Sequence, residues 1–334
     1  MSRNLLIRLG STMVTLFGVA FIVFILVRVV PGNPIAMMLP PGASDADIAL
    51  LTAHYGLDKP ILTQFWIWLG RALQGDFGMS ISLRQDVMSL IFGRLPATLE
   101  LATLALVIAM ALGGALAITA ARFRGTAVET GIDLANGASL AMPDFLWGLT
   151  FILLFGVLIP VFAISGRVSP SLDLPFVTGF YLIESILRLR VDIFLDLMRH
   201  MLMPALALAL PLAAVIAQLL KTSLKEAMQQ DYVMLARTKG FSETRVLISE
   251  ALRNAVIPTL TLAGVQFTFL IGGTVIVERL FSYEGLGNMA IDAVINRDLP
   301  LIQGIVLVFA LIFVVINLIV DLSYALLNPR LRHG

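Results

Sequence analysis

The segment LKTSLKEAMQQDYVMLARTKGFSETRVLISEALRNA, residues 220–255, separates two long apolar runs and determines how the rest of the chain is interpreted. Its first half repeats apolar residues at roughly helical spacing, and Gly240 ends that helix. Ser242 is placed to cap a second helix, with Phe241 and Val246 in the hydrophobic-staple positions. The segment therefore predicts a helix, a tight turn and a second helix. The alternative is a basic amphipathic loop folded onto the surface of a lipid bilayer.

The composition of the whole chain is that of an integral membrane protein. Of 334 residues, 58% are hydrophobic and only 13% are charged, about half the charged share of a typical soluble domain. The net charge of +1 excludes a disordered or nucleic-acid-binding chain. Cysteine is absent, which excludes disulfides, thiolate metal sites and a cysteine nucleophile. The three histidines, His54, His200 and His333, are too scattered to predict a metal site.

Six apolar runs are long enough to cross a bilayer, which requires about 20 residues each. They are Leu9–Val30, Leu99–Ala121, Leu134–Ile164, Met201–Leu220, Ala255–Val277 and Leu301–Leu327. Arg3 and Arg8 precede the first run as they would precede a signal peptide, but the run is too long and no A-x-A site follows. We therefore expect it to be a retained span. Pro143 and Pro160 lie inside the third run, which we expect to tilt or break.

The predicted orientation follows from the basic residues of the short loops. With six spans both termini lie on one side, and we expect that side to be the cytoplasm. Its loops and termini carry Arg3, Arg8, Arg122, Arg124, Lys221, Lys225, Arg237, Lys239, Arg245, Arg253, Arg330 and Arg332. The connections on the opposite side are much longer and hold most of the acids, and long loops translocate largely regardless of charge. The reverse orientation is the alternative.

The predicted organisation has four parts. Residues 1–30 form the N-terminus and first span, and residues 31–98 form a periplasmic loop with short helices. Residues 99–327 form a core of five spans containing the cytoplasmic loop 221–254, and residues 328–334 form a cytoplasmic tail.

Two helices are expected within the first loop. One begins near Ser44 and ends at Gly56. The other runs from Pro60 to a stop at Gly75 and places an apolar set on one face: Leu62, Phe65, Trp66, Leu69 and Leu73. Trp66 and Trp68 are interpreted as interfacial anchors, with ligand contact as the alternative.

Motifs in the central segment resemble those of a known family. They are Asp231-Tyr232-Val233, Ala236-Arg237-Thr238-Lys239-Gly240, Ala251-Leu252-Arg253-Asn254-Ala255 and Ile257-Pro258. These are similar to the cytoplasmic EAA loop of binding-protein-dependent ABC import permeases, in particular the dipeptide/oligopeptide/nickel branch. Further motifs of that branch are matched by Gly56–Pro60, Gly75–Ser80, Leu95–Glu100, Gly272-Gly273, Glu278, Phe281, Gly285–Gly287, Arg297-Asp298 and Asn328–Arg330. The long first periplasmic region resembles that of the B-type subunit.

The sequence departs from the family pattern at two places. Met234-Leu235-Ala236 stands where the wider family has Glu-Ala-Ala, so only Ala236 fits. Glu250 stands where this branch often has histidine. Contacts that depend on the side chains at positions 234, 235 and 250 are therefore not carried over from the family.

The resemblance implies a type I ABC importer permease in the bacterial inner membrane, working with three kinds of partner. These are a second, similar permease, two ATPase subunits docked at the cytoplasmic loop, and a periplasmic binding protein. The resemblance assigns the ATPase-coupling loop to Ala236, Arg237, Lys239, Gly240 and Phe241. Ala236 and Gly240 would permit close approach, while Arg237 and Lys239 would set electrostatic register at the rim. Gly240 is interpreted both as a helix cap and as the docking turn.

The chain itself is expected to hold no cofactor, metal or catalytic residue. None of its four lysines, Lys59, Lys221, Lys225 and Lys239, follows a glycine, so it lacks the G-x-x-x-x-G-K-[ST] phosphate loop. ATP and Mg²⁺ are therefore expected on the partner ATPases, and the chain is not expected to be an enzyme.

Polar residues within spans are functional candidates by default. Asp321 lies in the last span, with Asn317 one turn earlier on the same face. An interhelical hydrogen bond is favoured there, with a proton relay as the alternative. Asp144 directly follows Pro143 in the third span and is a candidate to line the pathway.

Two other classes of protein compete with the permease interpretation. A secondary transporter driven by an ion gradient predicts repeated halves and paired intramembrane charges, and neither is apparent. An intramembrane serine hydrolase requires a histidine within the membrane, and each histidine lies outside or at the edge of a span. The solute is left open among dipeptides, oligopeptides, nickel complexes and related small molecules.

Overall fold

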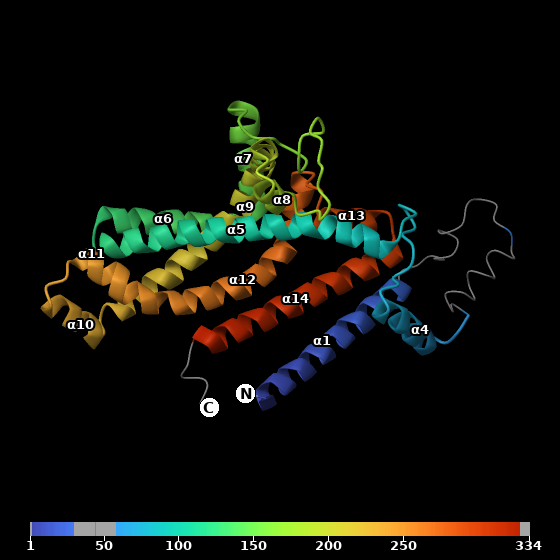
Figure 1. The fold of residues 1–334 in the computed structure, drawn as a ribbon, viewed down its shortest axis with the longest axis horizontal. Helices are drawn as coiled ribbons and strands as arrows, with labels where there is room; N and C mark the ends of the chain where they lie inside the picture. The colour runs from blue at the N-terminus through green and yellow to red at the C-terminus, as the bar shows by residue number, and fades with distance from the viewer. Residues whose placement is uncertain (1, 30–43, 45–57, 328–334) are drawn as a thin grey trace. The chain divides into compact units, whose positions relative to one another are not determined.

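The computed structural model describes residues 2–29, 44 and 58–327. Within these residues the regular secondary structure is helical apart from one isolated antiparallel β-bridge, between Met79 and Asp86, and turns and irregular segments connect the helices. Figure 1 shows the elements: α1 (Ser2–Val29), α4 (Ile61–Leu73), α5 (Val87–Arg122), α6 (Ala127–Ala141), α7 (Asp144–Phe151), α8 (Tyr181–Leu187), α9 (Val191–Ala227), α10 (Asp231–Thr238), α11 (Glu243–Arg245), α12 (Leu252–Leu280), α13 (Leu286–Ile295) and α14 (Leu299–Leu327), with π-helical segments η1 (Ile152–Leu158) and η2 (Val246–Ala251). The predicted all-α class is confirmed for this part of the chain. The expected helix ending at Gly56 and the tail 328–334 lie outside the described residues.

Four helices are long and apolar enough to cross a membrane. They are α5, α9, the continuous stretch Glu243–Leu280 and Leu299–Val320 within α14. A fifth candidate is the bent pair of α6 with α7–η1. The apolar part of α1, Gly10–Leu26, is shorter than these. The described chain therefore has four or five candidate spans by length and composition.

The third predicted span is broken at the expected proline. Ala127–Ala141 and Asp144–Leu158 meet at 101° across Met142 and Pro143. Proline has no N–H for the helical ladder and disfavours a helical residue before it. Met142 accordingly adopts extended torsions, φ −99° and ψ 125°. The change of direction from α6 to α7 is plain in Figure 1.

The chain divides into two compact units, residues 1–95 with 288–314, and residues 96–287 with 315–334. The first unit contains an aromatic cluster between α1 and α4. Phe65 is 1% exposed, and its ring centroid lies 5.2 Å from that of Phe21 and 5.4 Å from that of Phe24. Helix α4 begins directly after Pro60. Gly75, which has φ +83°, follows the end of this helix.

The residues predicted to share one face of α4 differ in exposure within the described chain. Phe65 is buried, whereas Leu62 and Trp66 are 64% and 61% exposed and Leu73 is 80% exposed. The helix carries apolar residues around most of its surface, so periodicity alone does not select one side. The side covered within this unit is selected by the phenylalanines of α1, which also reach Trp68, with Phe24 at 5.5 Å.

The second unit is built around α9. This helix packs against α6, α7, α8 and α12, and its buried residues are mainly alanine and leucine. Small residues allow membrane helices to approach closely. At Gly113 on α5, a Cβ atom would lie 2.9 Å from the Ile216 side chain and 2.5 Å from the Ala213 carbonyl oxygen. The tight contact of α5 with α9 therefore requires glycine at this position.

Candidate functional site

The helix-turn-helix predicted from residues 220–255 is present, and its turn is a complete Schellman motif. The Gly240 N–H donates to the Arg237 carbonyl at 2.9 Å, and the Phe241 N–H donates to the Ala236 carbonyl at 3.3 Å. Gly240 has φ +80°, a left-handed conformation that glycine adopts without a Cβ penalty. The glycine therefore acts as the predicted helix cap.

The second helix starts as expected at Ser242, but without the expected side-chain cap. Ser242 has N-cap torsions and its hydroxyl makes no capping bond. Its carbonyl instead accepts from the Val246 N–H at 2.9 Å. Phe241 packs against the buried cluster that contains Val246, as the hydrophobic staple predicted. Packing of Phe241, together with the backbone turn, thus defines this helix start.

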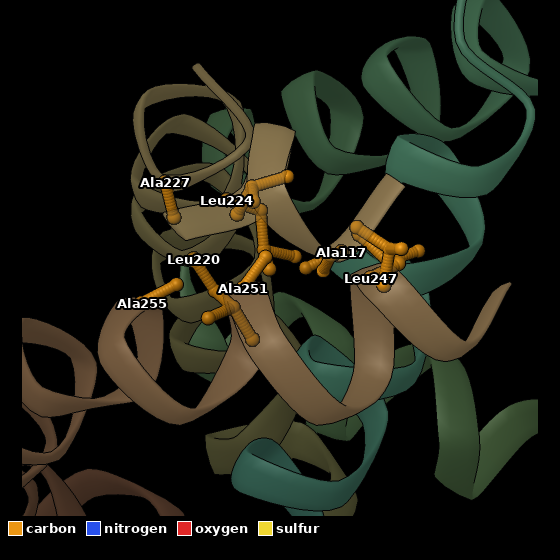
Figure 2. Packing of buried hydrophobic residues seen from close by; sticks show 10 residues of the cluster. Ala117, Leu220, Leu224, Ala227, Leu247, Ala251 and Ala255 are labelled. Carbon is orange, nitrogen blue, oxygen red and sulfur yellow. The ribbon is translucent and has the colours of Figure 1, made fainter. Parts of the chain in front are cut away.

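The inner face of α10 is fixed by an aliphatic cluster, here called the loop core. Figure 2 shows labelled members of this cluster from α5, α9, η2 and the beginning of α12, and α10 contributes two further members. Val233 and Ala236 are the α10 members, at 0% and 6% exposure. The full set is Ala117, Leu220, Leu224, Ala227, Val233, Ala236, Val246, Leu247, Ala251 and Ala255. A movement of α10 would therefore displace side chains of α9 and α12 that belong to the same cluster.

Three large apolar or aromatic side chains of α10 are uncovered within the described chain, among polar exposed residues of the same helix, Asp231, Arg237 and Thr238. Met234 and Leu235 are 63% and 56% exposed, and Tyr232 is 37% exposed. Exposed side chains of this kind on a short helix are one feature of docking surfaces. We call Tyr232, Met234 and Leu235 the outer patch.

Charged side chains border the turn. The Arg237 Nε donates to Glu243 Oε1 at 2.9 Å, and this hydrogen bond raises the pKa of Arg237 above its ordinary value. The Arg245 guanidinium lies 4.1 Å from the Phe241 ring centroid. Lys239 is exposed. Arg237 and Lys239 thus both face solvent beside the turn.

The five coupling residues predicted from sequence are together but do not share one surface. Arg237, Lys239 and Gly240 are exposed, Phe241 is half-buried, and Ala236 faces the loop core. The small size of Ala236 therefore permits close packing of α10 inside this chain. Sequence reasoning did not single out Met234 and Leu235, which are exposed between the buried positions 233 and 236.

A cavity of about 320 Å³ lies where α6 breaks into α7. Asp144, at the first position of α7, lines it, and Gln266 lines it from α12. The Asp144 Oδ1 accepts the Phe145 N–H at 2.9 Å. Asn317, on α14, is half-buried and does not line this cavity. The side chain of Asp321 lies outside the described residues.

A buried ion pair in the second unit was not predicted. Arg167 Nη2 donates to Glu100 Oε2 at 2.7 Å, and the two side chains are 5% and 3% exposed. The other carboxylate oxygen of Glu100 accepts the Leu182 N–H at 2.8 Å, which satisfies the N-terminus of α8. The Arg167 guanidinium also lies 3.9 Å from the Tyr181 ring centroid. We call this arrangement the Glu100–Arg167 network.

A second buried carboxylate, Glu278, accepts a 2.7 Å hydrogen bond from the Thr98 hydroxyl. The Thr98 hydroxyl oxygen in turn accepts the Leu286 N–H at 2.8 Å. A Cβ atom at Gly285 would collide with the Glu278 carboxylate, so the glycine makes room for it. Three motifs quoted above, around residues 98, 278 and 285, therefore meet in space.

The first unit contains a comparable site. Asp298 Oδ2 accepts from the Ser80 hydroxyl at 2.5 Å, the Ser82 hydroxyl at 2.7 Å and the Ser82 N–H at 2.9 Å. Burial opposes ionisation of Asp298, but the hydrogen bonds from Ser80 and Ser82 outweigh it and lower the pKa of the carboxyl. The motifs ending at Ser80 and Asp298 are thereby joined.

The candidate spans and the buried polar interactions between them are features of a multi-pass membrane protein. The helix-turn-helix around Gly240, with its exposed apolar residues, is the feature that points to a transport component. The family of binding-protein-dependent transport system inner membrane components matches residues 113–333, and the N-terminal domain model of those components matches residues 1–102. The chain belongs to this family.

Several transport system permease proteins align over almost the full chain. The di/tripeptide transport system permease protein DppB of Pseudomonas aeruginosa is 38% identical, covering 98% of this chain and 97% of that protein. The dipeptide transport system permease protein DppB of Escherichia coli K12 is 37% identical, covering 100% and 99%. The glutathione transport system permease protein GsiC of Escherichia coli O1:K1 / APEC is 35% identical, covering 98% and 97%.

A solved structure shares the fold. The crystal structure of an amino acid ABC transporter with histidines matches with a TM-score of 0.50 and 15% identity, over 71% of this chain and 93% of that one. The chain is therefore a multi-pass inner-membrane permease component with an ABC-importer fold. The relatives are transport components rather than enzymes, and the family match favours this class over an ion-gradient-driven transporter.

Proposed function

We propose that this chain is one permease of an ATP-driven importer of small peptides. A second permease would complete the translocation path, two ATPases would supply the energy, and a periplasmic binding protein would deliver the peptide. The names of the relatives, which transport dipeptides, tripeptides and glutathione, support a peptide substrate. The observation that carries the proposal is the helix-turn-helix around Gly240, with its inner face packed and its outer patch uncovered.

The outer patch is the proposed ATPase contact. An amphipathic helix binds an apolar groove through side chains on one face, and Met234 and Leu235 offer such side chains. Arg237 and Lys239 at the rim would fix orientation. Because Val233 and Ala236 belong to the loop core, a push on α10 would be transmitted to α9 and α12. This is a rigid-body route from the ATPase to the spans.

We propose six spans in the assembled membrane protein: α1, α5, the bent α6–α7–η1 segment, α9, α12 and α14. Both termini and α10 would then lie in the cytoplasm, in agreement with the basic residues of the short loops. ATP and Mg²⁺ would bind the ATPase partners, because this sequence has no phosphate loop.

Cysteine labelling tests the orientation, since the natural chain has no cysteine. Ser44→Cys should react with an impermeant thiol reagent applied from the periplasmic side of intact membranes. Thr244→Cys should react only after the membranes are permeabilised. The opposite pattern would place α10 outside the cell and remove the proposed ATPase contact.

Two nearly isosteric variants test the docking turn. No atom outside the immediate chain lies within 4 Å of a Cβ built at Gly240, so the space is open and the left-handed φ is the main constraint. Asn and Asp both tolerate that conformation, but only Asp adds a charge to the proposed interface. We expect Gly240→Asp to lose ATPase co-purification and ATP-dependent peptide uptake, and Gly240→Asn to retain most of both. Normal ATPase association in Gly240→Asp would refute docking at this turn.

A further inference from the structure

The cavity at the α6–α7 break has the dimensions and lining of a small-ligand site. Its volume of about 320 Å³ is at the lower end of ligand pockets, which run from about 300 Å³ upward. The walls come from three elements besides α6: Asp144 begins α7, Leu208 and Pro211 belong to α9, and Gln266 belongs to α12. Most of the lining residues are apolar. Among the described residues that line the cavity, Asp144 is the only charged one.

Asp144 lines this cavity, and one of its carboxylate oxygens, Oδ2, has no partner within the described residues. Oδ1 accepts the N–H of Phe145. Among residues 58–320, no side chain or backbone group makes a hydrogen bond or ion pair with Oδ2. Gly273 of α12 lies opposite, where a Cβ atom would be 3.6 Å from Oδ2. Its missing side chain leaves the carboxylate open to the cavity.

An uncompensated carboxylate within a membrane span is costly and calls for a cation. The position at the start of α7 stabilises the negative charge in part. No lysine, arginine or histidine lines the cavity within the described chain. By contrast, Glu100, on another span, is matched by Arg167 at 2.7 Å. The described part of this chain therefore supplies no cation for Asp144.

We propose that Asp144 contacts the α-ammonium group of a peptide during its passage through the permease. This proposal rests on the proposed function. Dipeptides, tripeptides and glutathione differ in side chains but all carry a free ammonium group, and the apolar walls accept different side chains. A single ionic contact also suits a pathway that must release what it accepts. Asp144 would thus recognise the feature that the transported solutes share.

The test uses the complete transporter in liposomes, with binding protein and radiolabelled dialanine, in a complex whose other subunits carry no reactive cysteine. Asp144→Asn should lower dialanine uptake about tenfold while ATP hydrolysis stimulated by the loaded binding protein persists. Asp144→Cys should show the same defect. Modification of that cysteine by a methanethiosulfonate with a sulfonate group should restore much of the uptake, and one with a trimethylammonium group should not.

Thr150→Cys is the matched control, because Thr150 lies on the same helix but does not line the cavity. Neither reagent should change its uptake in a manner that depends on the sign of the charge. Equal effects of both reagents at position 144, or dissociation of the complex in Asp144→Asn, would overturn the inference. Normal uptake by Asp144→Asn would also overturn it while leaving the proposed function intact. Absence of ATP-dependent dialanine uptake by the unmodified transporter would overturn both.

Discussion

The Glu100–Arg167 network and the loop core stabilise two regions of the same unit by opposite means. In the network, the charged side chains are buried at 5% exposure or less and pair with each other; Glu100 also accepts backbone N–H groups, and Arg167 also donates to the Gly179 carbonyl. In the loop core, alanine, leucine and valine are buried while the charges, such as Arg237 and Glu243, remain in solvent. A buried charge network tolerates no loss of a partner, whereas an aliphatic core leaves the outer surface free to vary. This difference suits a fixed structural function for the first region and the proposed docking function for the second.

The largest effect is expected from removing the cation of the network. Arg167→Met leaves Glu100 buried with its backbone contacts but without its ion-pair partner, which should cost about 3–5 kcal/mol. The midpoint of thermal unfolding of the detergent-purified chain measures this loss. A double variant, Glu100→Leu with Arg167→Met, should recover part of the stability, but not all, since Glu100 also accepts the Leu182 N–H. Unchanged unfolding of Arg167→Met would mean that the pair is not a brace.

A smaller effect on stability is expected from substitutions in α10, where a buried and an exposed residue should differ clearly in their effect on ATPase association. Val233 is fully buried and Leu235 is 56% exposed two positions later. Val233→Ala should cost about 2 kcal/mol through lost apolar burial and the cavity it leaves. Leu235→Ala should change the free energy of unfolding by no more than about 0.5 kcal/mol but weaken ATPase co-purification. If both variants lose stability alike and keep the ATPase, the outer patch is not a docking surface.

Sequence reasoning found the features that depend on local chemistry. The break at Pro143 follows from a missing N–H, and the turn at Gly240 follows from a positive φ, and both are visible in a single stretch of sequence. The Glu100–Arg167 network was not predicted, because its members are 67 positions apart and a lone arginine in a loop resembles a solvated one. The spacing of the apolar residues places them on one face of α4, but which of them are covered depends on the phenylalanines of α1 and is not visible in that spacing.

The pairing of Ser80 and Ser82 with Asp298 shows a further limit of sequence reasoning. Both motifs were noticed as family features, but nothing in either stretch indicates that they touch across a separation of 218 positions. The geometry also assigns Asp298 a structural function, since its Oδ2 is occupied by three donors from this short segment. Asp144 has the reverse character: its place beside Pro143 was evident from sequence, whereas its open cavity required the three-dimensional arrangement.

The smallest effect on stability is expected from an exposed ion pair between an arginine and a glutamate, the same two groups that are buried in the Glu100–Arg167 network. Arg237 and Glu243 form a 2.9 Å ion pair with side-chain exposures of 41% and 59%. Exposed pairs contribute about 0.2–1 kcal/mol because water screens them and side-chain entropy opposes them. Arg237→Gln should therefore change the free energy of unfolding by less than 1 kcal/mol, in contrast to Arg167→Met. Its effect should instead appear in the salt dependence of ATPase association, because a rim charge acts mainly on the rate of encounter. Thermal unfolding and association kinetics at low and high salt, measured on Arg237→Gln and Arg167→Met in parallel, separate the two functions of arginine. A large loss of stability in Arg237→Gln would show that charge, and not aliphatic packing, holds the helix-turn-helix together.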